Sequence, residues 1–186
     1  MSNRTDQVTT DLRATAHDVK TAFGGLSAAQ LNWKPAEKSW SVAQCLDHLI
    51  TTHELYFPLF EKLKTGDAKP NFWEKNSPLS RFFGKFLING LNPTNLKKMK
   101  TTGKAQPSSS EIAAEIVVKY VDHQTRLADA VSSVAPSIDP EKTIITSPLL
   151  AAITYSLEDC YTILVYHGQR HFGQAKRVTQ TEGFPV

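Results

Sequence analysis

The chain has 186 residues, 40% of them hydrophobic and 21% charged, which is typical of a single globular domain (residues 1–186) with a sizeable core. No stretch approaches the roughly 18 consecutive apolar residues of a membrane-spanning helix, and the polar start lacks a secretory signal, so we expect a cytoplasmic protein with no membrane partner. The formal net charge is +3, and because no nucleic-acid-binding motif accompanies it, we do not expect nucleic acid as a partner.

The first helix is predicted at residues 5–23, because apolar residues recur there at intervals of three and four. The positions that form its apolar face are Val8, Leu12, Ala16, Val19 and Phe23. Gly24 and Gly25 end this helix. Ser27 and Gln30 have the spacing of a capping box, so a short helical turn is predicted to follow.

The second long helix is predicted to begin at Ser41, because Ser41 and Gln44 have capping-box spacing and Trp40 can pack onto the first turn. It extends to about Lys64 with a kink at Pro58, since proline removes one backbone donor.

Residues 65–106 are predicted to form a long connection, because glycine and proline repeatedly interrupt the helical periodicity. Its aromatic residues indicate that the connection is partly helical and packed. These residues are Phe72, Trp73, Phe82, Phe83 and Phe86. Ten Lys/Arg and two Asp/Glu lie between Lys62 and Lys104, a local charge of +8 that suits an anionic ligand or partner, although solvated lysines are the commoner explanation.

The third helix is predicted to open at a capping box formed by Ser108 and Glu111 and to end before Pro136. The fourth is predicted from Ser156 to about Val178. Four long amphipathic helices without strand alternation predict an all-α protein: a four-helix bundle with a long, partly helical connection between its second and third helices. Facing helices of such a bundle can hold a metal site in their interior.

Two histidines on the predicted fourth helix point to such a site. His167 and His171 are four residues apart, so their rings project from the same face, close enough to chelate one ion. Gly168 follows His167 and no glutamate lies between the two histidines, which excludes the H-E-x-x-H chemistry of zinc proteases.

A third histidine ligand is not determined by spacing. His48 and His53 point about 140° apart around the second helix, so only one of them is expected to join the site. His123 lies near the middle of the apolar face of the third helix, and the three have comparable claims. Three neutral imidazoles would leave coordination positions open for a substrate, as in catalytic zinc sites.

Other side chains are candidates for the surroundings of the site. Cys45 lies one turn before His48 and could reach a metal as a thiolate, although a buried, reduced thiol is the commoner state of such a cysteine. Candidates for proton transfer or pocket lining are Tyr56, Tyr120, Tyr161 and His123.

The run from Trp40 to Leu49, followed much later by the run from His167 to Gln174, resembles the DinB/YfiT-like superfamily. The resemblance implies a four-helix bundle with a three-histidine metal site. It assigns His48, His167 and His171 as the ligands, and it gives Gln174 a supporting or packing role.

The resemblance also implies chemistry for the expected site. Zinc, nickel or manganese would activate either a low-molecular-weight thiol, such as mycothiol, bacillithiol or glutathione, for transfer to a small-molecule substrate, or a water for hydrolysis. Lys97, Lys98 and Lys100 could steer a carboxylate-bearing thiol towards the metal. The alternative is a non-catalytic, stress-related bundle that binds metal or a small ligand, or that forms a homodimer through apolar helix faces.

Overall fold

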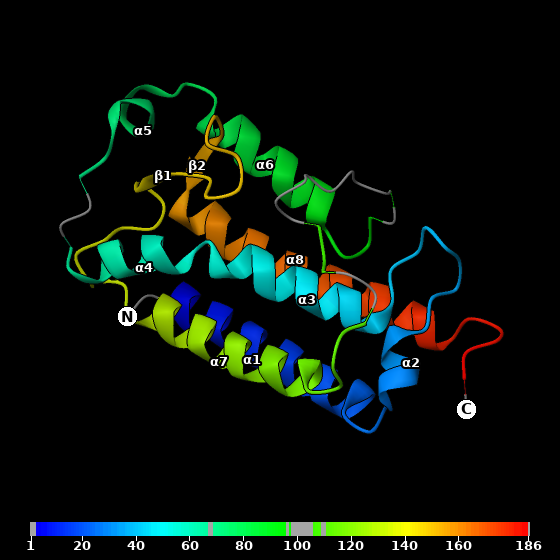
Figure 1. Cartoon of the computed structure of the whole chain (residues 1–186). Helices are drawn as coiled ribbons and strands as arrows, with labels where there is room; N and C mark the ends of the chain where they lie inside the picture. Colours follow the sequence, from blue (N-terminus) through cyan, green and yellow to red (C-terminus); the bar gives the residue numbers. More distant parts are fainter. Residues whose placement is uncertain (1–2, 67–68, 96, 98–105, 109–110, 186) are drawn as a thin grey trace.

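Four helices form the bundle that the sequence predicts, and they are neighbours in the order α1, α7, α3, α8. The computed structural model describes residues 3–66, 69–95, 97, 106–108 and 111–185. The bundle helices are α1 (Asn3–Phe23), α3 (Val42–Glu54), α7 (Ile116–Ser132) and α8 (Leu157–Thr179). Both α1 and α3 pack against α7 and α8, so α1 and α3 occupy opposite corners (Figure 1). Among the described residues, no helix has the length and apolarity to cross a membrane.

The second predicted helix is in fact two helices. α3 ends at Glu54, and α4 (Phe57–Lys64) begins after a tight turn in which the N–H of Tyr56 donates to the carbonyl of His53 at 3.0 Å. Pro58 lies in the first turn of α4, where its missing N–H costs no helical hydrogen bond. The predicted kink at Pro58 is therefore a break, because proline is accommodated more easily at the start of a helix than inside one.

Both capping boxes that were predicted in the N-terminal half of the chain are present. The Ser27 hydroxyl accepts from the N–H of Gln30 at 3.3 Å and caps the short α2 (Ala28–Asn32). The Ser41 hydroxyl accepts from the N–H of Gln44 at 3.1 Å, and the Gln44 side chain accepts from the N–H of Ser41 at 3.2 Å. The start of α3 is thus held at the residue that the sequence indicates.

The long connection contains α5 (Phe72–Asn76) and α6 (Ser80–Leu91), so its partly helical character is confirmed. α6 lies along α8 (Figure 1), and a Cβ atom at Gly84 would come within 2.2 Å of the Asp159 carboxylate. A larger residue at this position would therefore require the Asp159 carboxylate to move.

The aromatic residues of the connection are mostly on the surface. Phe72, Trp73, Phe82 and Phe86 are between 57% and 71% exposed, so the connection is packed, as expected, but not through these four rings. Their helices present these rings to solvent, and the opposite face of α6 makes the contacts with the core. The side chains of that face are Leu87, Ile88 and Leu91.

α7 begins later than the capping box predicted at Ser108, so this predicted start is wrong. The N–H of Ser108 donates to the Asp47 carboxylate at 2.6 Å, and the Asn32 side chain bonds both the N–H and the carbonyl of Ile112, at 2.9 and 2.7 Å. These contacts bind backbone groups that a helix would use. Residues 109–110 of the predicted box lie outside the described residues.

A small hairpin, absent from the sequence prediction, precedes α8. It pairs β1 (Ile144–Thr146) with β2 (Thr154–Ser156) in antiparallel register, with Ile145 opposite Tyr155. Both of these side chains are buried. The strands have three residues each, which is too short for an alternating pattern to be recognised.

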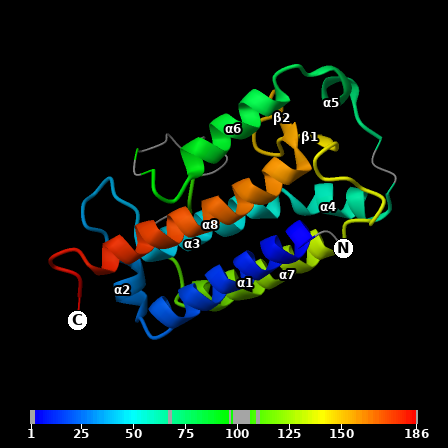
Figure 2. The ribbon, with the colours of Figure 1, turned by 180° about the vertical axis from the view of Figure 1, so that it is seen from behind.

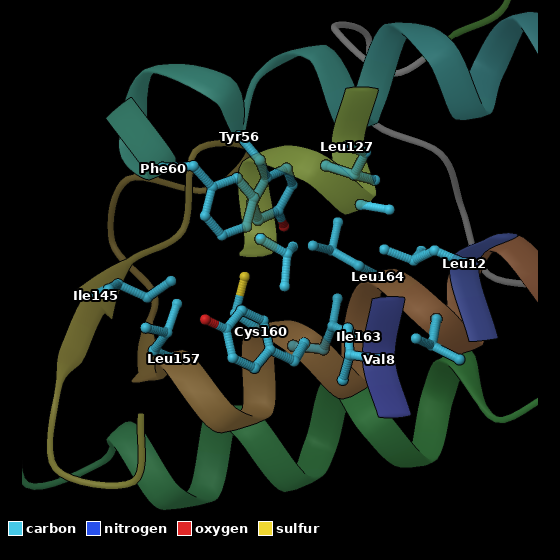
Figure 3. Close-up of a cluster of buried hydrophobic side chains, with 14 of the residues drawn as sticks. Val8, Leu12, Tyr56, Phe60, Leu127, Ile145, Leu157, Cys160, Ile163 and Leu164 are labelled. Carbon is cyan, nitrogen blue, oxygen red and sulfur yellow. The ribbon is translucent and has the colours of Figure 1, made fainter. Parts of the chain in front are cut away.

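The core consists of two clusters of buried apolar side chains. Figure 3 shows the first, in which side chains such as Val8, Phe60 and Ile145 converge on the beginning of α8. The second gathers around α3 and the end of α8, where Ala175 and Val178 lie. The buried stretch of α8 between these two clusters carries His167 and His171. Figure 2 shows α8 in front of α3 along much of the bundle.

Candidate metal centre

Three histidines converge where α3 and α8 pack together. His48, His167 and His171 each offer one ring nitrogen, and these nitrogens all lie within 4.8 Å of one another. The Nε2 atoms of His48 and His167 are 3.0 Å apart. The three side chains are at most 9% exposed. The structure thus brings together the two histidines of α8 and, of the open candidates for a third, His48.

The two rings on α8 are in an environment that favours their neutral form. Burial, followed by the neighbouring His48, lowers the pKa of His171 to about 3, and the Gln174 side chain opposes part of this shift. Burial and the ring of His171 lower the pKa of His167 well below its ordinary value. Neutral imidazole is the form that binds metal. Three buried imidazole nitrogens therefore fit a divalent ion of the zinc type.

One ring nitrogen supports this fit independently. The Nδ1 atom of His171 is buried and has no hydrogen-bond partner among the described residues. An unsatisfied buried polar atom costs about 1–3 kcal/mol. Coordination of an ion by the cluster would satisfy polar atoms that the protein otherwise buries at a cost.

Trp40 packs onto the histidines. The centroid of its ring lies 4.9 Å from that of His48 and 5.5 Å from that of His171, and the planes of Trp40 and His171 meet at 21°. The residue predicted to brace the first turn of α3 therefore also covers two of the three rings.

His53 contacts the cluster from the other side. Its Nε2 atom lies 3.1 Å from Nδ1 of His167, and its Nδ1 atom lies 3.2 Å from Nε2 of Gln124 on α7. The sequence treats His48 and His53 as alternatives, and it gives no role to Gln124. The sequence nevertheless contains an indication of a role for Gln124. This residue follows His123 within the apolar stripe of the third helix, where a buried polar side chain needs a partner.

His123 lies apart from the three-histidine cluster. Its Nε2 atom donates to the Glu54 carboxylate at 3.1 Å, and both residues line a second hollow between α3 and α7. Burial lowers the pKa of His123, and Glu54 opposes that shift.

Cys45 lies in the apolar core rather than in the cluster. It is fully buried among side chains that include Leu46 and Leu49. Burial raises the pKa of its thiol to about 12, so the thiol is protonated at neutral pH. Cys160 is buried in the first core cluster, and both cysteines are free, as expected.

The three candidate tyrosines have different surroundings. Tyr56 lines the cavity beside the histidines, and its hydroxyl lies 3.0 Å from that of Tyr155. Tyr161 stacks on Phe60 in the core, with ring centroids 6.4 Å apart. Tyr120 is buried, and neither its hydroxyl nor that of Tyr161 has a hydrogen-bond partner within the described ranges.

A cavity of about 570 Å³ opens beside the histidines. Its apolar wall comes from α6, α8 and the loop between the two strands. The residues of this wall are Leu87, Leu91, Leu149, Leu150, Ile163 and Leu164. Three cationic side chains, Lys38, Arg170 and Arg177, also line it, and the described residues contribute no aspartate or glutamate. The cavity is therefore apolar at one wall and positively charged elsewhere.

Arg170 links α8 to the segment that follows α6. Its guanidinium donates to the carbonyls of Asn92 at 3.4 Å, of Asn95, and of Lys97 at 2.5 Å. Part of the basic connection is thus attached beside the cavity. Lys98 and Lys100, which were expected to steer an anionic thiol, lie outside the described residues.

These features define a class: a four-helix bundle whose adjacent helices present three buried histidines to a cavity. The chain belongs to the DinB superfamily, whose family model matches residues 11–175. The resemblance noted in the two histidine-containing runs is confirmed.

The fold is similar to a solved structure. YfiT from Bacillus subtilis matches with a TM-score of 0.58 and 13% sequence identity, over 100% of this chain and 91% of that one. That protein is described as a probable metal-dependent hydrolase with an unusual four-helix bundle topology. At this identity the likeness shows the fold alone. Comparison with curated proteins gives no significant sequence match.

Proposed function

We propose that this chain is a metal-dependent enzyme in which His48, His167 and His171 hold one divalent ion beside the substrate. The observation that carries the proposal is the convergence of three buried imidazoles, with nitrogens within 4.8 Å of one another, next to a cavity. A bound ion would supply Lewis-acid chemistry, lowering the pKa of a thiol or of a water. Among zinc, nickel and manganese, imidazole donors favour zinc or nickel.

The lining of the cavity favours a thiol as the nucleophile. Hydrolysis by zinc enzymes commonly uses a glutamate as general base, and the described lining of this cavity holds no carboxylate. A thiol, with an ordinary pKa of about 8.5, needs much less activation than water. We therefore place thiol transfer first, and hydrolysis, the activity suggested for YfiT, second.

The side chains of the cavity suit a substrate with an anionic group and an apolar body. Lys38, Arg170 and Arg177 would attract a carboxylate, as found in many low-molecular-weight thiols. The leucine-rich wall would bind the apolar part, and Trp40 would limit access of water to His48 and His171.

Metal analysis of the purified protein tests the first half of the proposal. The wild-type chain should carry about one divalent ion, and His48→Ala, His167→Ala and His171→Ala should each abolish most of it. His123→Ala is the matched control, because His123 is an equally buried histidine outside the cluster. Metal contents that do not change in the three cluster variants would overturn the proposal.

Activity assays separate the two reactions. The metal-loaded protein is given thiols with electrophilic acceptors in one series and esters, amides and lactones in another, each with and without a chelator. Chelator-sensitive turnover in the first series supports thiol transfer, and in the second series it supports hydrolysis. Stoichiometric metal without turnover in either series favours the non-catalytic binding protein.

A further inference from the structure

We propose that Gln124 and His53 form a hydrogen-bond relay that sets which nitrogen of His167 is available to the metal. The inference rests on the proposed metal site and adds two positioning residues to it. Neither residue belongs to the three-histidine cluster, and each acts through His167.

The relay is a continuous line of four buried side chains from three helices. Gln124 Nε2 lies 3.2 Å from His53 Nδ1, His53 Nε2 lies 3.1 Å from His167 Nδ1, and His167 Nε2 lies 3.0 Å from His48 Nε2. Gln124 is 0% and His53 1% exposed, so solvent contributes little to these bonds.

Each contact in this line needs one donor and one acceptor. A neutral imidazole carries a single N–H, so it donates at one nitrogen and accepts at the other. The direction of one hydrogen bond in the line therefore fixes the direction of the next.

The first direction starts from the amide nitrogen of Gln124. If this nitrogen donates to His53 Nδ1, then His53 carries its proton on Nε2 and donates to His167 Nδ1. His167 then carries its proton on Nε2 and donates to His48. All contacts are satisfied in this direction. With its proton on Nε2, however, His167 has no lone pair on that atom to bind an ion that it would share with His48.

Metal binding at His167 Nε2 requires the opposite direction. The His167 proton must lie on Nδ1 and donate to His53 Nε2, so the proton of His53 must lie on Nδ1. That proton needs an acceptor, and half a turn of the Gln124 amide puts Oε1 in the place of the nitrogen. Each ring carries one proton in both states, so the change needs no net gain or loss of protons.

Glutamine is suited to this position because it can serve both directions. Its amide offers a donor for the metal-free state and an acceptor for the metal-bound state at nearly the same point in space. The Oε1 atom of Gln124 is buried and has no hydrogen-bond partner among the described residues. It is therefore available as the acceptor that the metal-bound state needs.

Metal affinity measured by calorimetry tests the relay. Gln124→Met keeps the approximate shape but removes the acceptor, and His53→Phe removes the middle of the line. Each should weaken metal binding about 10- to 100-fold, the usual effect of losing a partner of a ligand histidine. Gln124→Glu supplies an acceptor and should bind metal at least as tightly as the wild type. The Gln124→Met/His53→Phe double variant should lose no more than the worse single variant, because both changes interrupt the same line.

Tyr120→Phe is the matched control, because it removes another buried polar group from α7, one turn from Gln124. It should stay within twofold of the wild type. In wild-type protein, nitrogen NMR of His167 gives a readout that a purely structural role would not move. The proton should be on Nε2 without metal and on Nδ1 with zinc.

The outcomes separate this inference from the proposed function. If the wild type binds metal and His48→Ala does not, but Gln124→Met and His53→Phe bind like the wild type, the relay is refuted and the metal site stands. A His167 proton on Nε2 in the zinc form would also refute the relay, even if the variants failed to fold. If the wild type binds no metal, the proposed function fails and the relay fails with it.

Discussion

His48 and His167 face each other with their Nε2 atoms 3.0 Å apart, although they are separated by 119 positions in the sequence. The contact joins α3 to α8, the two helices that carry the whole three-histidine cluster. Two metal–nitrogen bonds of about 2.0–2.1 Å can span this separation. The proposed metal site therefore depends directly on the packing of α3 against α8.

Acidification should destabilise the metal-free protein. Burial lowers the pKa of His171 from 6.5 to about 3, and it also lowers the pKa of His53 and His167. Below pH 6.5 the unfolded chain binds protons that the folded chain does not, so the free energy of unfolding decreases as the pH falls. Each such histidine contributes at most about 1.4 kcal/mol per pH unit to this decrease. Above pH 6.5 this dependence should disappear.

Denaturant unfolding between pH 7.5 and 4.5, after chelation, measures this dependence. His171→Phe should reduce the slope. His17→Gln, at an exposed histidine of α1, is the control. Stability that is constant or rises as the pH falls would contradict the buried, neutral state of the histidines.

Truncation of Trp40 should weaken metal binding without abolishing it. The ring packs on His48 and His171, and such aromatic contacts are worth about 1 kcal/mol, or roughly fivefold in affinity. Trp40→Ala should show this loss, and Trp40→Phe should recover most of it. Equal affinities for all three proteins would mean that the indole does not orient the histidines.

Loss of the cationic side chains should affect substrate binding rather than metal content. Lys38→Ala and Arg177→Ala should each raise KM about two- to fivefold for a substrate with a carboxylate, the range expected of partly solvated charges. A neutral substrate analogue is the control and should show no change. Equal effects on the charged and the neutral substrate would exclude an electrostatic role.

The cap of α3 should contribute measurably to stability. Because the Ser41 hydroxyl accepts from the N–H of Gln44 at 3.1 Å, Ser41→Ala should lower the free energy of unfolding by about 1 kcal/mol. Ser39→Ala, at a nearby half-buried serine that does not cap the helix, should change it little. Urea unfolding of the two variants makes the comparison, and equal stabilities would show that the cap is dispensable.

The part of the candidate site that lies on a single helix was predictable from the sequence. Helical spacing alone pairs His167 with His171. The choice among His48, His53 and His123 needed the family resemblance, because all three are buried, at 3%, 1% and 4% exposure, and only the positions of their rings relative to His167 and His171 distinguish them. That information lies in the packing of the bundle, as does the contact of His53 with His167.

The helices were predictable where local signals act alone, and less so where distant groups compete with them. The capping box at Ser41 holds, since the contacts of its backbone among the described residues are those of the helix start itself. The box predicted at Ser108 fails because Asn32 and Asp47, far away in the sequence, bind the same stretch of backbone. The homodimer and the cytoplasmic location stay predictions.

X-ray absorption spectroscopy of the zinc-loaded protein tests the central claim most directly, because it identifies the atoms bound to the metal. We predict three imidazole nitrogens at about 2.0–2.1 Å and no sulfur, with one imidazole fewer in any His48→Ala protein that still retains zinc. A sulfur ligand, or a set of ligands unchanged by His48→Ala, would contradict a metal site built from His48, His167 and His171.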